Sequence, residues 1–289
     1  MLNKRAESGG RARRVVILGA GGFVGSAAAK ILTNRGHTVL ALTRSDVDLA
    51  AEGAASVLGG LMEPDDVMVI AAAKAPTKTN QMLQANIAIQ SALCEAIEHA
   101  RPSHVVYVSS DAVYRDSAAP LTEGSCAQPS SLHGVMHLSR EVMLQEVCAA
   151  NLCVLRPTLI YGLADPHNGY GPNRFVRTAR QDGEIVLFGG GEEVRDHVLV
   201  DDVVSLLAEV VDADAVGTLN VATGRAVSFE GIATLVAEAI RRSVSIRSLP
   251  RSGPMPHGGR REFDATSTHD AFPDFSYTSL EDGISGLCA

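Results

Sequence analysis

Short apolar segments recur along the first half of the chain, each separated from the next by a stretch of mixed polarity. Runs of mostly apolar residues lie at 15–18, 38–42, 65–73, 103–114 and 151–162. Strands buried on both faces of a parallel sheet have this near-continuous apolar character, whereas half-exposed strands alternate between apolar and polar residues. The pattern therefore predicts an α/β protein with a doubly wound parallel sheet.

The segments between these runs have the apolar spacing of helices, most clearly at 26–34 and 80–100. Beyond residue 160 the alternation of apolar runs with helical segments becomes less regular. It predicts a loop at 161–175, two short strands around a glycine turn within 184–204, a strand, turn and helix within 217–240, and an irregular tail at 250–289 that ends in a short helix. We interpret this second half as a smaller lobe that closes over the ends of the strands.

These patterns define the expected domains. Residues 1–14 are polar and partly basic, which predicts a flexible N-terminal arm and excludes a secretory signal. Residues 15–160, joined by about 198–222, form the larger domain. Residues 161–197 and 223–289 form the smaller, substrate-binding lobe.

A glycine-rich turn follows the first predicted strand. Gly19, Gly22 and Gly25 stand at G-x-x-G-x-x-G spacing, and Phe23 and Val24 open the next helix. Such glycines let the chain turn sharply and bring backbone N–H groups to a pyrophosphate at the helix N-terminus. Because the turn lies between a strand and a helix, it predicts a dinucleotide-binding Rossmann domain.

The end of the second strand bears on the choice of dinucleotide. A carboxylate there usually contacts the ribose 2′-hydroxyl of NAD, but here Thr43 and Arg44 occupy the position. A guanidinium neutralises and hydrogen-bonds a 2′-phosphate, so we predict NADP(H) over NAD(H). Asp48 is near enough in sequence to reach the adenine or the ribose. The alternative is that Arg44 is a solvated surface residue.

Composition and charge exclude several classes of function. The 289 residues carry a net charge of −8, which argues against general nucleic-acid binding, and no apolar run approaches membrane length. The five cysteines form no C-x-x-C pair, which is typical of reduced, buried thiols in a cytoplasmic protein. Ser109, Ser110 and Asp111 follow a predicted strand at its carboxyl end, where ligands bind in such sheets.

From Val15 onward the chain resembles the extended short-chain dehydrogenase/reductases, which include sugar-nucleotide epimerases, dehydratases and 4-ketoreductases. The matching segments are "GAGGFVG", "DVMVIAAA", "ANIAIQSALCEAI", "VVYVSSDAVY", "RPTLIYG", "VRDHVLVDDVV", "LNVATGRAVSFEGIA" and "SLEDGI", in the order and at about the spacing of that family. The resemblance implies a nucleotide-sugar substrate, a nicotinamide coenzyme and a homodimer formed by paired helices. The candidate dimer surfaces are "ANIAIQSALCEAI" and the helix at 135–150, although their apolar faces suit core packing equally well.

The resemblance also implies roles for individual residues. Ser110 matches the serine or threonine that hydrogen-bonds the reacting sugar oxygen, and Asp111 matches an aspartate that some dehydratases and 4-ketoreductases carry next to it. The residues expected at the coenzyme are Gly19, Gly22, Phe23, Val24, Gly25, Thr43, Arg44, Asp48, Ala72, Asn86 and His137. Those expected at the substrate, besides Ser110, are Asn173, Arg195 and either Arg260 or Arg261.

One motif of that family is replaced. Where the family carries Tyr-x-x-x-Lys, this chain reads "SLHGVMHLSRE", so His133 stands at the tyrosine and His137 at the lysine. Leu159 stands where the family usually has an asparagine. Spacing of four on a helix places both imidazoles on one face.

The histidine pair has three interpretations. In a rebuilt proton-transfer site, His133 would serve as general acid or base beside Ser110, and His137 would bond the ribose. In a zinc site the pair would need a third ligand, which the sequence does not offer. In a catalytically altered protein, the fold would bind a dinucleotide or sugar nucleotide without hydride transfer. Tyr114 and Asp111 are further candidates for the proton donor.

We favour an NADP-dependent reductase or epimerase of a nucleotide-activated sugar with a histidine-based proton site. Among these reactions we favour reduction of a ketone, because Arg44 favours NADP(H) and "SSDAVY" resembles the 4-ketoreductases. The alternative is a non-redox or catalytically altered binding protein of the same fold. No metal is expected.

Overall fold

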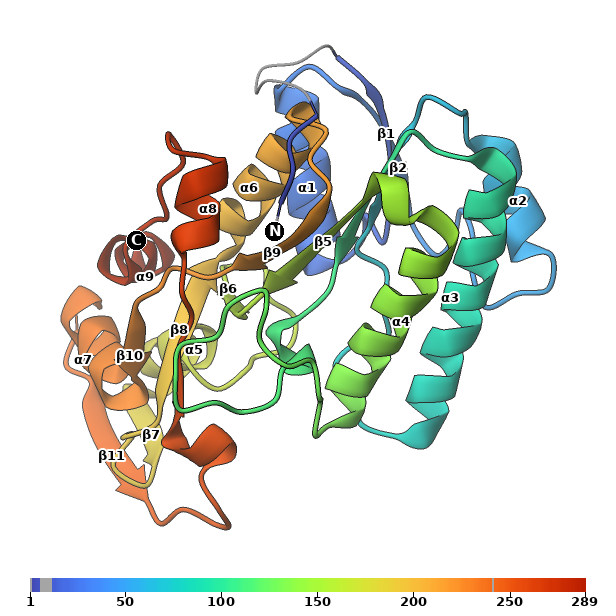
Figure 1. Cartoon of the computed structure of the whole chain (residues 1–289). Helices are drawn as coiled ribbons and strands as arrows, with labels where there is room; N and C mark the ends of the chain where they lie inside the picture. The colour runs from blue at the N-terminus through green and yellow to red at the C-terminus, as the bar shows by residue number, and fades with distance from the viewer. Residues whose placement is uncertain (1, 6–11, 241) are drawn as a thin grey trace.

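A parallel sheet of six strands forms the centre of the computed structural model, which describes residues 2–5, 12–240 and 242–289 (Figure 1). The strand order is β2-β1-β3-β4-β5-β9. The strands span β1 Arg14–Leu18, β2 Thr38–Leu42, β3 Val67–Ile70, β4 His104–Val108, β5 Leu152–Pro157 and β9 Gly217–Val221. All neighbours pair in parallel, which confirms the predicted sheet.

Helices cover both faces of this sheet, because each strand directs alternate side chains to opposite sides. Val15 and Ile17 pack in one core with α1 (Phe23–Asn34) and α6 (Val200–Asp212). Val16 and Leu18 pack in the other with α2 (Ala54–Leu61), α3 (Asn80–Ala100) and α4 (Leu132–Cys148). The sheet is therefore wound on both sides, as the apolar runs predict.

Several apolar residues of the two expected dimer surfaces belong to this core. Leu93 and Ile97 of α3 and Leu144 of α4 are almost fully buried against the sheet. Val142 of α4 remains exposed, at 62%. Core packing thus accounts for these buried side chains, and a homodimer stays a prediction.

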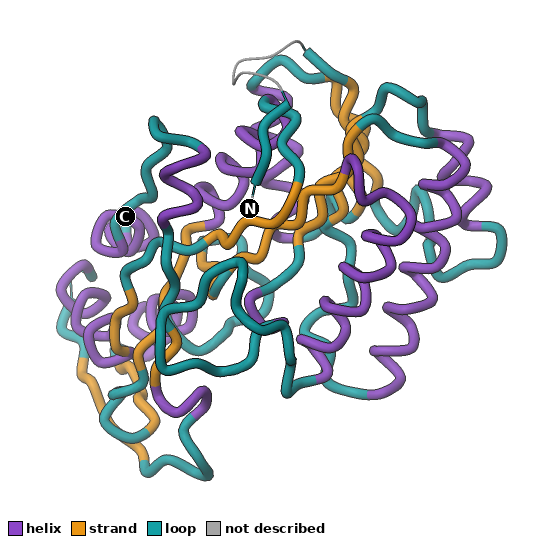
Figure 2. Tube along the Cα trace, viewed as in Figure 1, coloured by secondary structure: helices purple, strands orange, loops and turns teal. Residues whose placement is uncertain are grey.

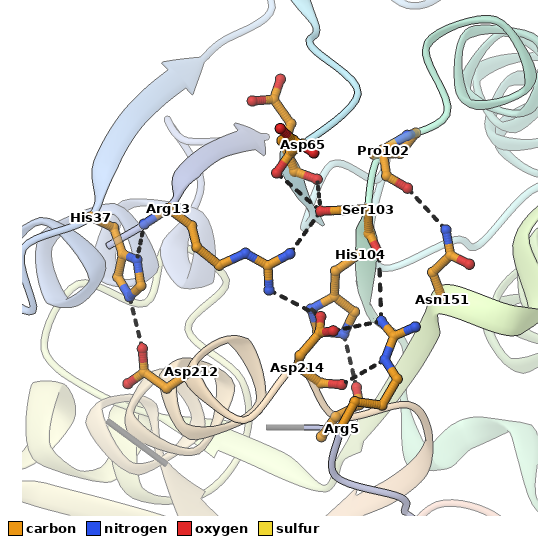
Figure 3. A network of polar contacts seen from close by, with 12 residues as sticks. Arg5, Arg13, His37, Asp65, Pro102, Ser103, His104, Asn151, Asp212 and Asp214 are labelled. Carbon is orange, nitrogen blue, oxygen red and sulfur yellow. Dashed lines mark hydrogen bonds and ion pairs between the residues drawn. The ribbon is translucent and has the colours of Figure 1, made fainter. Parts of the chain in front are cut away.

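The N-terminal residues are partly docked on the sheet rather than free. Asn3 pairs with Val216, just before β9, and Arg5 forms an ion pair with Asp214 (Figure 3). Arg13 donates to the same aspartate and to Ser103, which precedes β4. Residues 2–5 thus contact the large domain where a flexible arm was expected, and the flexibility of the arm stays a prediction. Residues 6–11 lie outside the described part of the chain.

A second lobe is built from the later half of the chain (Figure 1), and its short strands form small sheets (Figure 2). Its strands are β6 (Leu159–Tyr161), β7 (Glu184–Phe188), β8 (Val194–Leu199), β10 (Ala226–Ser228), β11 (Ser245–Leu249) and β12 (Arg260–Arg261). Its helices are α5 (Pro172–Asp182), α7 (Phe229–Ala239) and α9 (Leu280–Cys288). β7 pairs with β11 and β8 with β10, so the two strands predicted around the glycine turn are not partners of each other.

Several element boundaries differ from the sequence prediction for local reasons. The strand predicted at 151–162 is split, because the backbone leaves the main sheet at Thr158 and continues as β6 beside β8. The tail returns to the large domain through α8 (Thr266–Ala271), where Ala271 and Phe272 join its core. Cys94, Cys148 and Cys153 are buried as expected, but Cys126 is exposed. The part of the chain that the structure describes holds no helix suited to crossing a membrane.

Candidate active site

Two adjoining hollows lie beyond the carboxyl ends of the central strands, where the strand order reverses between β1 and β3. Their volumes are about 850 and about 550 Å³, and Gly22, Ala71 and Ala73 line both. In open α/β sheets a ligand binds at this switch point. The hollows therefore form one cleft with a larger and a smaller arm.

The glycine turn separates the two arms and is packed too tightly for side chains. A Cβ on Gly25 would lie 2.1 Å from the carbonyl oxygen of Gly19, and one on Gly19 would lie 2.7 Å from the nitrogen of Ala72. Gly19 also has a φ of +86°. Phe23 and Val24 begin α1 at the wall of the larger arm, and no side chain caps this helix end. This close-packed loop at an uncapped helix N-terminus fits a pyrophosphate.

Replacing Gly25 with alanine is expected to disrupt this turn. The new methyl group would meet the backbone of Gly19, which cannot move aside as a flexible side chain would. We expect the free energy of unfolding to fall by roughly 1–3 kcal/mol, as overpacking typically causes. Denaturant unfolding measures the change. Gly60→Ala in α2 is the matched control, because a Cβ there has nothing within 4 Å, and an equal loss in both variants would contradict the account.

Thr43 and Arg44, which follow β2, line the smaller arm together with Asp48, and their contact with a coenzyme stays a prediction. Thr43 is fixed by Asp46, which accepts from its N–H and its hydroxyl. Arg44 is exposed and forms an ion pair with Asp48, with 3.1 Å between Nη2 and Oδ2. A hydrogen bond from the Ala50 N–H, together with Arg44, lowers the pKa of Asp48. Arg44 and Asp48 thus place one positive and one negative charge at the smaller arm.

The two histidines of α4 lie together on the wall of the larger arm. Ser131 caps this helix by accepting from the Gly134 N–H, which starts α4 earlier than the predicted helix at 135–150. The imidazoles of His133 and His137 meet edge to face, with 4.7 Å between ring centroids. Nδ1 of His133 accepts a long hydrogen bond of 3.5 Å from the Thr77 N–H.

Both histidines are neutral near pH 7. Burial lowers the pKa of His133, and the charge of Asp111 only partly opposes this. Burial also lowers the pKa of His137 well below its usual value, with further contributions from His133 and Arg140. A neutral imidazole has one unprotonated nitrogen, so His133 acts as a base first and as an acid only after protonation. That nitrogen is Nδ1 while it accepts from the Thr77 N–H, so proton uptake requires this long hydrogen bond to open or the ring to change tautomer.

Ser110 and Asp111 lie at the end of β4 beside the histidines, as the sequence predicts. Ser110 caps a short 3₁₀ turn, Asp111–Val113, and its Oγ lines the larger arm. Asp111 accepts from Nε of Arg261 at 2.9 Å, so this carboxylate is committed to an ion pair. Tyr114 donates to Asn220 at 2.6 Å, and burial raises its pKa. Among these groups, His133 is therefore the best placed proton carrier.

The expected substrate residues divide into two groups. Arg195 and Arg261 line the larger arm. Arg260 points away, with its side chain 63% exposed and paired with Glu262, so the expectation for Arg260 is corrected in favour of its neighbour. Asn173 is buried outside the cleft lining, because its amide donates to Asp165 and accepts from the Gly162 N–H.

Asn86 has a different position from the one expected. Its amide accepts from the Lys74 N–H and donates to Lys74, Thr77 and Met82, and it does not line the cleft. Asn86 instead holds the loop whose Thr77 N–H reaches His133. Ala72 lines the smaller arm, as predicted.

Sequence reasoning missed the polar residues behind the cleft. Tyr107 reads as a core aromatic within an apolar strand, but its hydroxyl lies 2.7 Å from Nδ1 of His137. Glu141 and Arg156 form a buried ion pair behind Ser109. A charge within a predicted buried strand requires a partner, so Arg156 was the available clue. Among residues 2–5, 12–240 and 242–289, no group of three or more His, Cys, Asp or Glu side chains is arranged to hold a metal ion.

Comparison with known proteins agrees with this geometry. ADP-L-glycero-D-manno-heptose-6-epimerase of Alkalilimnicola ehrlichii is 27% identical over 306 residues, which covers 93% of this chain and 95% of that protein. The structure of UDP-glucose 4-epimerase of Thermotoga maritima with UDP-glucose superposes with a TM-score of 0.82 at 22% identity, over 95% of this chain and 97% of that one. RMD from Pseudomonas aeruginosa, complexed with NADPH, gives 0.82 at 20% identity, over 96% and 98%. A family model matches residues 15–222, and the chain belongs to the NAD dependent epimerase/dehydratase family.

Proposed function

We propose that this chain is an epimerase-type oxidoreductase of a nucleotide-activated sugar, with NADP as coenzyme and His133 as proton carrier. The observation that carries the proposal is the neutral imidazole of His133 beside Ser110, in the cleft that the glycine turn opens onto. The bound nicotinamide would supply a hydride acceptor and donor.

The residues of the cleft divide the proton chemistry between them. Neutral His133 would take the proton of a sugar hydroxyl as that carbon is oxidised, and would return it when the ketone is reduced. Ser110 would donate its hydroxyl proton in a hydrogen bond to the same oxygen. A reaction that begins with reduction needs His133 protonated beforehand, which its lowered pKa opposes near pH 7. We therefore infer a cycle in which the sugar is oxidised first and reduced afterwards. The sequence alone suggested a simple reduction of a ketone.

The support for a nucleotide sugar comes from the relatives and from the wall of the cleft. The curated relatives are named as epimerases of an ADP-activated heptose, and a solved structure of the same fold holds UDP-glucose. Arg195 and Arg261, both largely buried, bring two guanidinium groups to this arm of the cleft. Arg195 pairs with Glu193, and Arg261 pairs with Asp111 and Asp116, so an anionic diphosphate would have to share these groups with the carboxylates. The test is incubation of the coenzyme-loaded chain with a panel of nucleotide sugars, followed by chromatography for an epimer or a keto product. A panel bound without conversion would favour the alternative, a binding protein.

Coenzyme choice is tested by replacing Arg44 with alanine. A guanidinium paired to a 2′-phosphate makes a charge-assisted hydrogen bond, so we expect NADPH affinity to fall by about tenfold while NADH affinity stays constant. Calorimetric titration measures both. Lys30→Ala removes an exposed cation from α1 outside the cleft and serves as the control. An unchanged NADPH to NADH ratio would remove Arg44 from the proposal and leave Asp48 as the determinant, on the ribose of NAD.

A further inference from the structure

A buried column of polar side chains stands behind His137. Tyr107 of β4 places its hydroxyl 2.7 Å from Nδ1 of that histidine. The guanidinium of Arg140, also on α4, lies 5.0 Å from the centroid of the Tyr107 ring. Nε of Arg140 donates to Gln90 of α3 at 2.8 Å. Tyr107, Arg140 and Gln90 are at most 1% exposed, and His137 is 5% exposed.

The hydrogen bond between Tyr107 and His137 has a fixed direction. Nδ1 of His137 lies 2.7 Å from the Tyr107 hydroxyl, and the Ser109 side chain is a second polar neighbour of the same phenol. Burial raises the pKa of Tyr107 to about 12, so the phenol keeps its proton at neutral pH. A buried O–H requires an acceptor, and Nδ1 of His137 and the hydroxyl oxygen of Ser109 are the candidates. We assign the phenol proton to Nδ1, for which the structure shows a contact of 2.7 Å. Nδ1 is therefore unprotonated, and the neutral ring carries its hydrogen on Nε2.

Several features of its surroundings disfavour protonation of His137. A second hydrogen on Nδ1 would face the hydrogen of the Tyr107 hydroxyl. Burial, followed by His133 and the Arg140 guanidinium, lowers the pKa of the imidazole. The ring lines the larger arm of the cleft, so it offers that space a neutral N–H donor rather than a cation.

We propose that Tyr107 is a positioning residue, which fixes His137 as the Nε2–H tautomer and thereby presents one N–H donor to the cleft. That this donor meets a ribose hydroxyl of the nicotinamide nucleotide rests on the proposed function. By fixing this tautomer, Tyr107 would allow the imidazole of His137 to donate a hydrogen bond where the family motif has the ammonium group of a lysine. Arg140 and Gln90 hold the Tyr107 ring in place by stacking and hydrogen bonding.

The tautomer is measured by proton–nitrogen correlation NMR on the ligand-free chain labelled with ¹⁵N-histidine. Signals of His137 are assigned by their absence in His137→Gln. We expect an unprotonated Nδ1 and a protonated Nε2 in the wild type, and a shift toward Nδ1–H or a mixture in Tyr107→Phe. Tyr170→Phe removes a hydroxyl of the second lobe and should leave these signals unchanged. A protonated Nδ1 in the wild type, or an unaltered tautomer in Tyr107→Phe, would overturn the assignment.

The coenzyme half of the proposal has a separate readout. Losing one well-oriented hydrogen bond should weaken NADPH binding to Tyr107→Phe by roughly three- to tenfold in calorimetric titration. An altered tautomer with unchanged NADPH affinity would overturn this half alone. Failure of the wild type to bind NADPH or NADH would refute the proposed function, whereas the NMR spectrum of the wild type would still decide the tautomer.

Discussion

Hydride transfer is expected to slow by about 10²–10⁴-fold when His133 is replaced with alanine, which is the usual contribution of a positioned general base. The imidazole of His133 is neutral, lines the larger arm beside Ser110, and is held by the Thr77 N–H. The other acid–base candidates are engaged, because Asp111 pairs with Arg261 and Tyr114 bonds Asn220. Single-turnover absorbance of the nicotinamide, recorded with a substrate from the nucleotide-sugar panel, measures the rate.

The same variant should still bind NADPH, because the glycine turn and the end of β2 lie outside its contacts. His99→Ala removes an exposed imidazole at the end of α3 and is the matched control, with wild-type rates expected. A His133→Ala variant that turns over normally would show that another group carries the proton. Loss of coenzyme binding together with the rate would assign His133 a binding role instead.

The largest expected stability effect comes from breaking the ion pair between Glu141 and Arg156. Both side chains are at most 10% exposed, with 2.5 Å between Nη2 and Oε2. Ser109 donates to the same carboxylate, and Arg156 also donates to the Tyr114 hydroxyl. Arg156→Met would leave the carboxylate buried without its cation. We expect the free energy of unfolding to fall by roughly 3–5 kcal/mol in denaturant titrations.

Two further variants test whether the loss comes from leaving a buried charge unpaired. The double variant Glu141→Leu, Arg156→Met removes both charges and should recover much of the loss, because no unpaired ion remains. Arg247→Ala breaks a surface pair with Glu184, where the side chains are 52% and 35% exposed, and should lower the free energy of unfolding far less than Arg156→Met does. Equal losses in Arg156→Met and Arg247→Ala would mean that burial does not govern the strength of these pairs.

The overall fold can be predicted from the sequence because its determinants are local. Apolar runs such as 15–18 specify strands buried on both faces, and the glycine turn specifies a helix directly after the first strand. Both features are contained within one strand–helix unit. The docking of Asn3 and Arg5 onto the sheet is a contact with residues more than 200 positions away, and no local pattern predicts it.

The candidate site was predictable only where a motif fixes both position and direction. Ser110 and His133 lie at the cleft because the end of β4 and one face of α4 both meet there. Arg260 and Arg261 could not be distinguished, because β12 is two residues long and its pleat sends neighbouring side chains to opposite faces. Tyr107 has no sequence pattern of its own, since its role depends on a histidine on another element.

The most direct test of the histidine-based site is the pH dependence of the single-turnover hydride transfer in the wild type, from about pH 5 to about pH 10. A neutral histidine base is active above its pKa and inactive below it. Because the pKa of His133 is lowered from 6.5, the rate should be constant through neutral and alkaline pH and should fall only below about pH 6.5. A rate that instead rises up to about pH 10 would identify a phenol as the base and contradict the histidine-based site.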